Sequence, residues 1–463
     1  MHWMNRRGGF AVVTGAAIAL LMTAPGRAQD DARALAEAYN AGGSALFKQV
    51  SAAPGNIVLS PLSVGTAMAM ALSGARGETE REMASVLAQR LDRSAMAAAN
   101  GTLLTAFKLY DKSAASCPQG MQITKPAGGA QDGANGGARC EGALRPDGRC
   151  SFPAVRQGER CVAAGSPQPS ARLLTANALM LAGRGDLVAS DYAALLKDKF
   201  GAEIFRDAGL DDVNAWVKRK TEGKIERILE TLDHSAAAVI LNAVYFKAKW
   251  AAVFAKPATT DEAFNLSRQK KVSVPTMRRS GSYALVVQPL YRALRLPYEV
   301  GQIGMIIVLP NDVAGLDAVS HSFEADEWTQ LASALHAPDA TKPTDLALPR
   351  FKASFDANLV PAFRALGMVR AFDLKQADFS GMTGRPASQV PFAIGSIVHR
   401  AVIEVMEDGT EAAAATALSM LTASAQRPIE EMQVFHVDHP FLFAIVDDAS
   451  GAVLFQGRIV DPR

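Results

Sequence analysis

The sequence predicts an α+β protein in which helices come first and strands follow. Residues 31–112 carry apolar side chains at helical spacing, whereas the chain from residue 173 onward contains eight runs rich in β-branched and aromatic residues and bounded by turn residues. Strands and helices do not alternate along the chain, which argues against a parallel βαβ architecture. Apolar residues make up 49% of the chain and charged residues 20%, so a folded core is expected.

Three helices are predicted near the N-terminus. Residues 32–49 have an apolar face, and residues 77–91 form an amphipathic segment. Between them, Pro61 suits the first position of a helix that Ser60 would cap. The small and Met-rich faces of this middle helix indicate that it is buried.

The predicted strands follow in order. Each is short, rich in β-branched or aromatic residues and ended by a turn signal. They are residues 173–181, 237–250, 293–299, 304–310, 345–355, 397–405, 441–448 and 451–460. The last two are expected to form a hairpin around residues 447–451.

The charge balance excludes several classes of partner. The chain has 48 Lys and Arg against 46 Asp and Glu, a net charge of +2. A nucleic-acid binder or a polybasic membrane patch would carry a clear basic excess, so neither partner is expected.

The N-terminus has the layout of a secretory signal peptide over residues 1–28. Arg6 and Arg7 precede an apolar run at residues 9–24, and small residues suit cleavage after Ala28. The run is shorter than the roughly 20 residues that cross a membrane, so an anchor is the weaker alternative. The arginine pair leaves twin-arginine export open. We therefore expect a secreted or periplasmic protein without membrane insertion.

Four cysteines lie in one segment, residues 113–170, which is rich in Gly and Pro and interrupts the domain predicted over residues 29–463. They are Cys117, Cys140, Cys150 and Cys161. In an exported protein this even set predicts two disulfides, and all three pairings stay open. A zinc site is the alternative, but the sequence separations of 23, 10 and 11 lack the short pairs that zinc sites favour.

Eight motifs in order resemble the serpin family of serine protease inhibitors. They are NIVLSPLSVGTAMAMALSGARGET (56–79), VNAWVKRKTEGKI (213–225), LNAVYFKAKW (241–250), LPRFKASFDANLVPAFRALGM (348–368), FDLKQADFSGM (372–382), VHRAVIEVMEDGTEAAAATA (398–417), DHPFLFAI (438–445) and VLFQGRIVDP (453–462). The resemblance implies a serpin fold: a helix cluster, three β-sheets and an exposed reactive-centre loop near the C-terminus. The Ala- and Arg-rich chain and its signal segment suggest an exported bacterial member.

The start of that loop has the pattern of a strand that could enter a sheet. With a period of two, one face carries Thr410, Ala412, Ala414 and Thr416, which are small and uncharged. Gly409 can supply the turn that follows Glu407. A charge or a proline on this face would block entry. For this segment alone, an alanine-rich surface helix is the alternative.

The resemblance implies a suicide inhibitor rather than an enzyme. In inhibitory serpins the protease serine forms an acyl-enzyme with the loop, and the cut loop inserts into the central sheet of a metastable fold. By family spacing the reactive bond is Ala423–Ser424, sixteen residues after Glu407, which suits an elastase-like or subtilisin-like protease. Neighbouring bonds stay open, because the segment after Ser424 is longer than in most relatives. A cysteine protease is a second possible target.

Further residues match conformational controls of the family. Ser60, Ser63, Asn214 and His399 match the shutter, a hydrogen-bond cluster under the central sheet, and Trp250 matches the loop entrance with Glu407. The serine-hydrolase elbow, zinc-protease and phosphate-loop motifs are missing, so no cofactor or metal is expected. We expect a monomer, and a non-inhibitory serpin-fold binding protein is the alternative function.

Overall fold

The computed structural model describes residues 25–110, 171–181, 187–206, 208–231, 238–323, 326–410 and 431–463, with short strands between residues 115 and 167. The helices are α1 (Pro25–Val50), α2 (Pro61–Gly74), α3 (Gly77–Val86), α4 (Arg93–Tyr110), α5 (Ser190–Phe200), α6 (Leu210–Lys220), α7 (Leu316–Ser322), α8 (Glu327–Leu335), α9 (Val360–Ala365) and α10 (Ser380–Thr383), with 3-10 turns η2 (Lys256–Ala258) and η3 (Arg370–Phe372).

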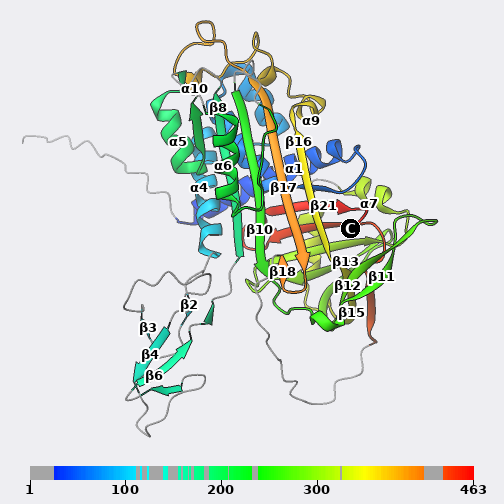
Figure 1. Ribbon diagram of the computed structural model, residues 1–463. Helices are drawn as coiled ribbons and strands as arrows, with labels where there is room; N and C mark the ends of the chain where they lie inside the picture. Colours follow the sequence, from blue (N-terminus) through cyan, green and yellow to red (C-terminus); the bar gives the residue numbers. More distant parts are fainter. Residues whose placement is uncertain are drawn as a thin grey trace, which may run out of the picture.

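A six-stranded sheet forms the centre of the molecule. Its strands, in spatial order, are β16 (Phe351–Asn358), β17 (Ile394–Met406), β18 (Gly409–Thr410), β10 (Ala238–Lys249), β8 (Ala171–Leu181) and β9 (Glu203–Arg206). Strands β10 and β17 also pair directly, in parallel. The long strands β10 and β17 run side by side down the middle of Figure 1.

A nine-stranded sheet contains most of the remaining strands. They are β1 (Ile57–Leu59), β21 (Val453–Ile459), β20 (Phe441–Asp447), β14 (Ile303–Pro310), β13 (Tyr291–Pro297), β12 (Lys271–Val287), β15 (Thr341–Pro349) and β19 (Gln433–His436), with β11 (Thr260–Asn265) on β12. Strand β12 pairs with β11 and β15 through its first part and with β13 through its last residues. Strand β12 thus connects β11, β13 and β15 into one continuous sheet.

Helices cover both faces of the central sheet. Helix α6 lies in front of β8 and β10 in Figure 1, where Val213, Trp216 and Val217 share a buried cluster with residues of both strands. On the other face, α2 belongs to the main core, and nearly all of its residues are buried. The seam between β10 and β17 is thus enclosed on both sides.

The segment predicted as an insertion contains short strands. Strand β2 (Ala115–Ser116) pairs with β7 (Ser166–Pro167), and β3 (Gln122–Thr124), β4 (Arg139–Ala143), β6 (Arg160–Ala164) and β5 (Val155–Gln157) form a separate sheet. Cys140 is on β4 and Cys161 on β6, with Cys140 opposite Ala163 in the register. Cys117 and Cys150 lie outside the described residues, so the disulfides stay a prediction.

Most predicted elements occur where the sequence placed them. Ser60 caps α2, since its side chain accepts a hydrogen bond from the Ser63 backbone N–H. The C-terminal hairpin is β20 and β21. The strand predicted over residues 345–355 is instead two strands that belong to different sheets, β15 and β16, separated at Arg350. In the described part of the chain, no helix is long and apolar enough to span a membrane.

Candidate functional site at the seam of the central sheet

The seam between β10 and β17 is closed at one end and open at the other. Residues Ala238–Tyr245 of β10 pair with Ile394–Val402 of β17. Beyond this stretch, β18 lies between the two strands, with Thr410 opposite both Ala248 and Val405. The predicted loop hinge therefore already contributes two residues to the sheet.

Gly409 can only be glycine at this position. Its φ is +142°, and a Cβ there would lie 2.2 Å from the backbone oxygen of Ala248. No real Cβ approaches a backbone atom so closely, so any side chain would force β18 and β10 apart. The turn predicted at this glycine is where the chain reverses from β17 into β18.

Glu407 anchors the turn before β18. Its Oε1 accepts hydrogen bonds from Arg350 Nε at 2.7 Å and from Thr259 Oγ1 at 2.6 Å. Burial raises the pKa of the Glu407 carboxyl, but these hydrogen bonds outweigh burial and hold the pKa below its ordinary value. The carboxylate is therefore charged and paired at neutral pH.

Trp250 packs against the open end of the seam from the side of β10. Its indole nitrogen donates to the backbone oxygen of Met406 at 2.9 Å, and its ring stacks on Tyr298 with centroids 4.4 Å apart. The Tyr298 hydroxyl lies 2.8 Å from Thr410 Oγ1. The structure thus brings Trp250, Glu407, Gly409 and Thr410 together at one end of the seam.

Three polar side chains cross the closed end of the seam in register. Asn177 on β8, Asn242 on β10 and His399 on β17 are opposite one another. Asn242 Nδ2 lies 2.5 Å from Asn177 Oδ1 and 2.7 Å from Ser63 Oγ, and His399 Nδ1 is 2.5 Å from Asn242 Oδ1. Asn242 therefore ties three strands of the sheet to α2.

His399 is neutral in this cluster. It is fully buried, and burial lowers its pKa from 6.5 to about 3. Nδ1 donates to Asn242, and Nε2 has no hydrogen-bond partner in the described part of the structure. Protonation would leave a charge in the core without a counterion, because the side-chain partner given to His399 among the described residues is the neutral amide of Asn242.

Ser60 and Ser63 lie beneath the closed end. Ser60 Oγ donates to the backbone oxygen of Leu454 at 2.6 Å and accepts from Ser63 N at 3.1 Å. The cap of α2 is thereby fixed to strand β21. Ser63 in turn presents its Oγ to Asn242, which connects the helix cap to the seam.

Asn214 was placed in this cluster by the sequence, and this placement is wrong. It lies on α6, on the other face of the sheet, where Oδ1 accepts from Ile228 N at 2.9 Å and Leu229 N at 3.1 Å. The cluster is held together by Asn242 and Asn177, which were not predicted as site residues. The available signal was an asparagine in the middle of each of two otherwise apolar strands.

The remaining predicted loop residues lie outside the described part of the chain. They are Ala412, Ala414, Thr416, Ala423 and Ser424. Among the described residues there is no cluster of His, Cys, Asp and Glu suited to a metal ion.

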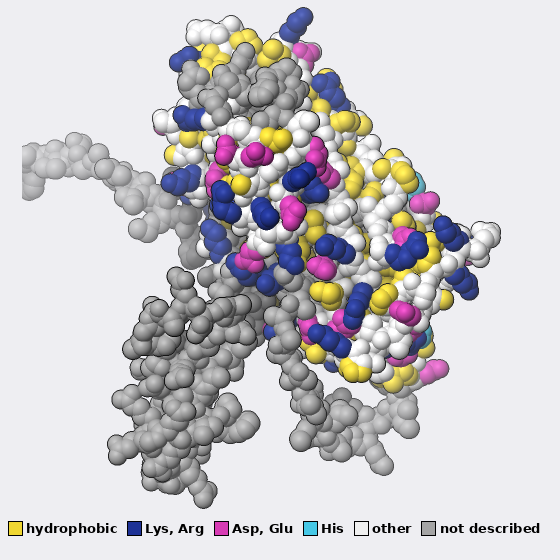
Figure 2. Space-filling model, viewed as in Figure 1, with side chains coloured by type: hydrophobic (Ala, Val, Ile, Leu, Met, Phe, Trp, Pro, Cys, Tyr) yellow, Lys and Arg dark blue, Asp and Glu magenta, His cyan; other side chains and the backbone are white. Residues whose placement is uncertain are grey.

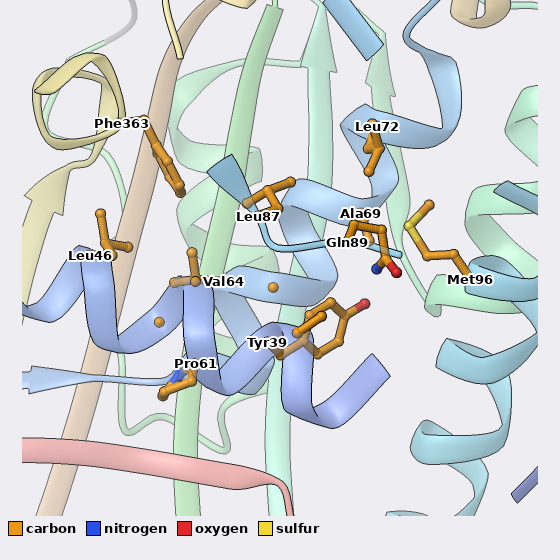
Figure 3. A pocket seen from close by; sticks show the side chains of 14 residues that line it. Tyr39, Leu46, Pro61, Val64, Ala69, Leu72, Leu87, Gln89, Met96 and Phe363 are labelled. Carbon is orange, nitrogen blue, oxygen red and sulfur yellow. The ribbon is translucent and has the colours of Figure 1, made fainter. Parts of the chain in front are cut away.

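Several hollows of the described part of the chain lie away from the seam, and two of them bear on the binding of an organic ligand. An apolar pocket between α1, α2 and α9, shown in Figure 3, has a volume of about 20 Å³, too small for an organic ligand. Tyr39, Val64 and Phe363 line it. A cleft of about 390 Å³ lies between α1, α8 and the β20–β21 hairpin, lined by Arg33, His336 and Asp448 among others.

The surface over α6 carries charges of both signs. Figure 2 shows Lys and Arg interspersed with Asp and Glu on this face, without a large area of one sign among the side chains it describes. Several of these charges are paired across elements, including Lys220 with Glu203 at 2.8 Å and Lys224 with Glu404 at 3.9 Å.

The sequence of this chain matches the model of one protein family. The family model described as Serpin (serine protease inhibitor) matches residues 37–123 and 154–462. This chain therefore belongs to the serpin family, and the expected serpin fold is confirmed. Residues 124–153, which the match omits, fall within the predicted insertion.

Relatives from distant organisms cover most of the chain. A protein of Cyanea capillata named serine protease inhibitor is 30% identical over 89% of this chain and 94% of its own length. An uncharacterized serpin-like protein of Thermococcus kodakarensis is 29% identical over 90% of this chain and 83% of its own. The human leukocyte elastase inhibitor is 36% identical over 59% of this chain and 73% of its own.

Solved serpin structures share the architecture. Serpin48 of the insect Tenebrio molitor, described as a highly specific serpin, is 25% identical, has a TM-score of 0.69 and covers 93% of this chain and 98% of its own. Human thyroxine-binding globulin, solved with its hormone bound, is 21% identical, has a TM-score of 0.69 and covers 93% of this chain and 99% of its own. The fold thus hosts both inhibitors and a binding protein, and does not by itself decide between them.

Proposed function

We propose that this serpin is an inhibitor that traps serine proteases as covalent acyl-enzymes. The target serine attacks the reactive loop, which we place at Ala423–Ser424, and the cleaved loop enters the seam between β10 and β17. A small residue before the cut bond suits an elastase-like or subtilisin-like enzyme. The signal-like N-terminus supports action outside the cytoplasm.

One observation supports this proposal above the others. Gly409 and Thr410 already pair with β10 and β17, so the hinge and the seam fit each other. The face that follows in sequence, Ala412, Ala414 and Thr416, is small and uncharged. Extending β18 would therefore add strand hydrogen bonds without burying a charge.

The test is a mixing experiment with four proteases. The protein from Gln29 onward is incubated with elastase, subtilisin, chymotrypsin or trypsin, denatured and separated on a gel. We expect a band of summed mass with elastase or subtilisin, and a released peptide that begins at Ser424 by mass spectrometry. Cleavage in the loop by all four enzymes without such a band would contradict the proposal.

A second candidate, a ligand-binding protein, is favoured by the cleft between α1 and α8. Asp448 is held there between Arg295 and His336, with a 2.5 Å contact to Arg295 Nη2 and a 3.1 Å contact to His336 Nε2. A polar rim around Trp328 suits a small molecule that is largely apolar. This reading predicts that loop cleavage leaves the thermal stability unchanged, whereas loop insertion would raise it strongly.

A further inference from the structure

A cleft lies where the end of α1, helix α7 and strand β21 meet. Its volume is about 200 Å³, which is enough for a small ion together with bound water. Phe47 and Ala52 form an apolar wall on the side of α1. The polar part of the lining includes Ser51, Ser320 and Arg458, which come from three different elements.

Arg458 brings a positive charge to this cleft. It lies on β21 and is only 7% exposed. Its Nε donates to the backbone oxygen of Gly55 at 3.2 Å, and its Nη2 donates to the backbone oxygen of Ala53. These two carbonyls orient the guanidinium but do not neutralise it. In the described part of the chain Arg458 forms no ion pair, and its Nη1 has no hydrogen-bond acceptor.

The charge of Arg458 is incompletely balanced by its surroundings. Burial lowers the pKa of the Arg458 guanidinium below its ordinary value, and the charge of Asp317 opposes this effect only in part. Asp317 is exposed, and it is the one carboxylate among the residues that line the cleft, against the cations of Lys48 and Arg458. Because a buried cation without a counterion is costly, an anion bound here would be stabilised.

Two serine hydroxyls at the cleft also lack partners. The Oγ atoms of Ser51 and Ser320 are buried, and neither has a hydrogen bond in the described part of the chain. Because no hydrogen bond fixes their rotamers, each hydroxyl can turn toward the cleft by rotation about χ1. Buried hydroxyls without partners are uncommon in folded proteins. Two of them beside one unpaired guanidinium indicate a ligand with several hydrogen-bond acceptors.

We propose that this cleft is a binding site for a phosphate group. Arg458 reaches it from β21, Ser51 from the end of α1 and Ser320 from α7, so the donors converge from three directions. A tetrahedral phosphate directs its oxygens toward all three, whereas a carboxylate presents two oxygens in one plane. The inference does not rest on the proposed function, because none of these residues belongs to the seam or to the reactive loop.

The test measures anion binding by isothermal titration calorimetry at constant ionic strength. The probes are inorganic phosphate, glycerol 1-phosphate and acetate, and each is exchanged against sodium chloride. Arg458→Gln removes the cation, and Ser320→Ala removes one hydroxyl. Ser44→Ala is the matched control, because Ser44 is also a buried serine without a partner but does not line the cleft.

We expect saturable phosphate binding by the wild type, together with a rise in its melting temperature. Ser320→Ala should bind phosphate roughly ten-fold more weakly, the loss typical of one hydrogen bond to a charged group. Arg458→Gln should show no saturable binding, and Ser44→Ala should bind as the wild type does. Tighter binding of glycerol 1-phosphate would identify a phosphate monoester as the ligand, and tighter binding of inorganic phosphate would identify the free ion.

Three results would overturn the phosphate site. They are the absence of saturable phosphate binding by the wild type, acetate binding as tight as that of phosphate, and an equal affinity of Ser320→Ala and Ser44→Ala for phosphate. Ser320→Ala removes a hydroxyl that has no partner in the fold, so the loss of this group breaks no hydrogen bond. This variant therefore decides the question even if Arg458→Gln does not fold.

Discussion

The two ends of the same seam differ in the side chains that lie between the strands. At the open end, Gly409 and Thr410 separate β10 from β17, and small side chains allow a third strand to fit. At the closed end, Asn242 and His399 join the two strands directly through their side chains. A growing β18 would first separate the backbone pairing that ends at Tyr245 and Val402, and would then have to separate the polar row at Asn242 and His399.

The largest expected effect concerns the face of the loop that would enter the seam. Ala414→Arg should abolish the covalent complex and turn the protein into a substrate, because insertion would bury an unpaired guanidinium. Ala415→Arg, one position along and on the opposite face, is the matched control and should still trap protease. Both are measured by the fraction of protease found in the denaturant-stable band. Equal trapping by the two variants would show that the alternation does not govern entry.

A smaller effect is expected when the two ends of the seam are compared by their contributions to the free energy of unfolding. Asn242→Ala leaves His399 Nδ1, Asn177 and Ser63 without a shared buried partner, and we expect a loss of about 2–4 kcal/mol in the free energy of unfolding. Thr259→Val, which removes one hydrogen bond to Glu407 at the open end, should cost about 1 kcal/mol. Denaturant unfolding measures both. A larger loss for Thr259→Val would reverse the comparison.

A pH dependence that belongs to the closed end should be no larger than the loss expected for Asn242→Ala. His399 has a pKa of about 3 in the fold against 6.5 as its ordinary value. The unfolded chain therefore binds the proton more readily than the folded protein does. The contribution of neutral His399 to the free energy of unfolding is complete above pH 6.5 and is lost as the pH falls toward 3. Between pH 7 and 5 the loss is about 2 kcal/mol.

Melting temperatures at pH 7 and pH 5 measure this effect, with His399→Gln as the control. The wild type should lose stability over this interval, and the variant should be nearly flat. The pKa values of Glu407 and Asp345 are lowered in the fold, so these carboxyls affect stability mainly below their ordinary values of 4.5 and 3.8. A variant with the same slope as the wild type would assign the titration to another group.

Much of the fold could be predicted from local patterns. Ser60 and Pro61 mark the start of α2, and the apolar runs of β10, β14 and β20 mark buried strands. The division at Arg350 was not predicted, because β15 and β16 are separated by a single residue and yet join different sheets. Which sheet a strand joins depends on contacts distant in sequence, and alternation within the strand does not record them.

The candidate site was predictable at its open end and only in part at its closed end, where Ser60, Ser63 and His399 were expected but Asn242 was not. Gly409 and Glu407 could be recognised from the local sequence. Gly409 suits the backbone conformation of the turn, and Glu407 lies just before the hinge. Asn242 and Asn214 are both asparagines in motifs shared with the family, and the sequence does not say which face of the sheet each occupies. The helix that carries Asn214 covers the outer face, whereas Ser63 meets Asn242 from within.

The two residues of β18 change the kinetic nature of the step that would follow loop cleavage. Starting a new strand between two others is a nucleation event, in which chain entropy is lost before hydrogen bonds accumulate. Here the nucleus is already part of the folded protein, with Thr410 buried and bonded to Tyr298. If the proposed function holds, insertion is a propagation reaction that starts from a seeded end. In such a reaction the folded state has removed the lag before strand formation, and it has not changed the rate at which the strand then extends.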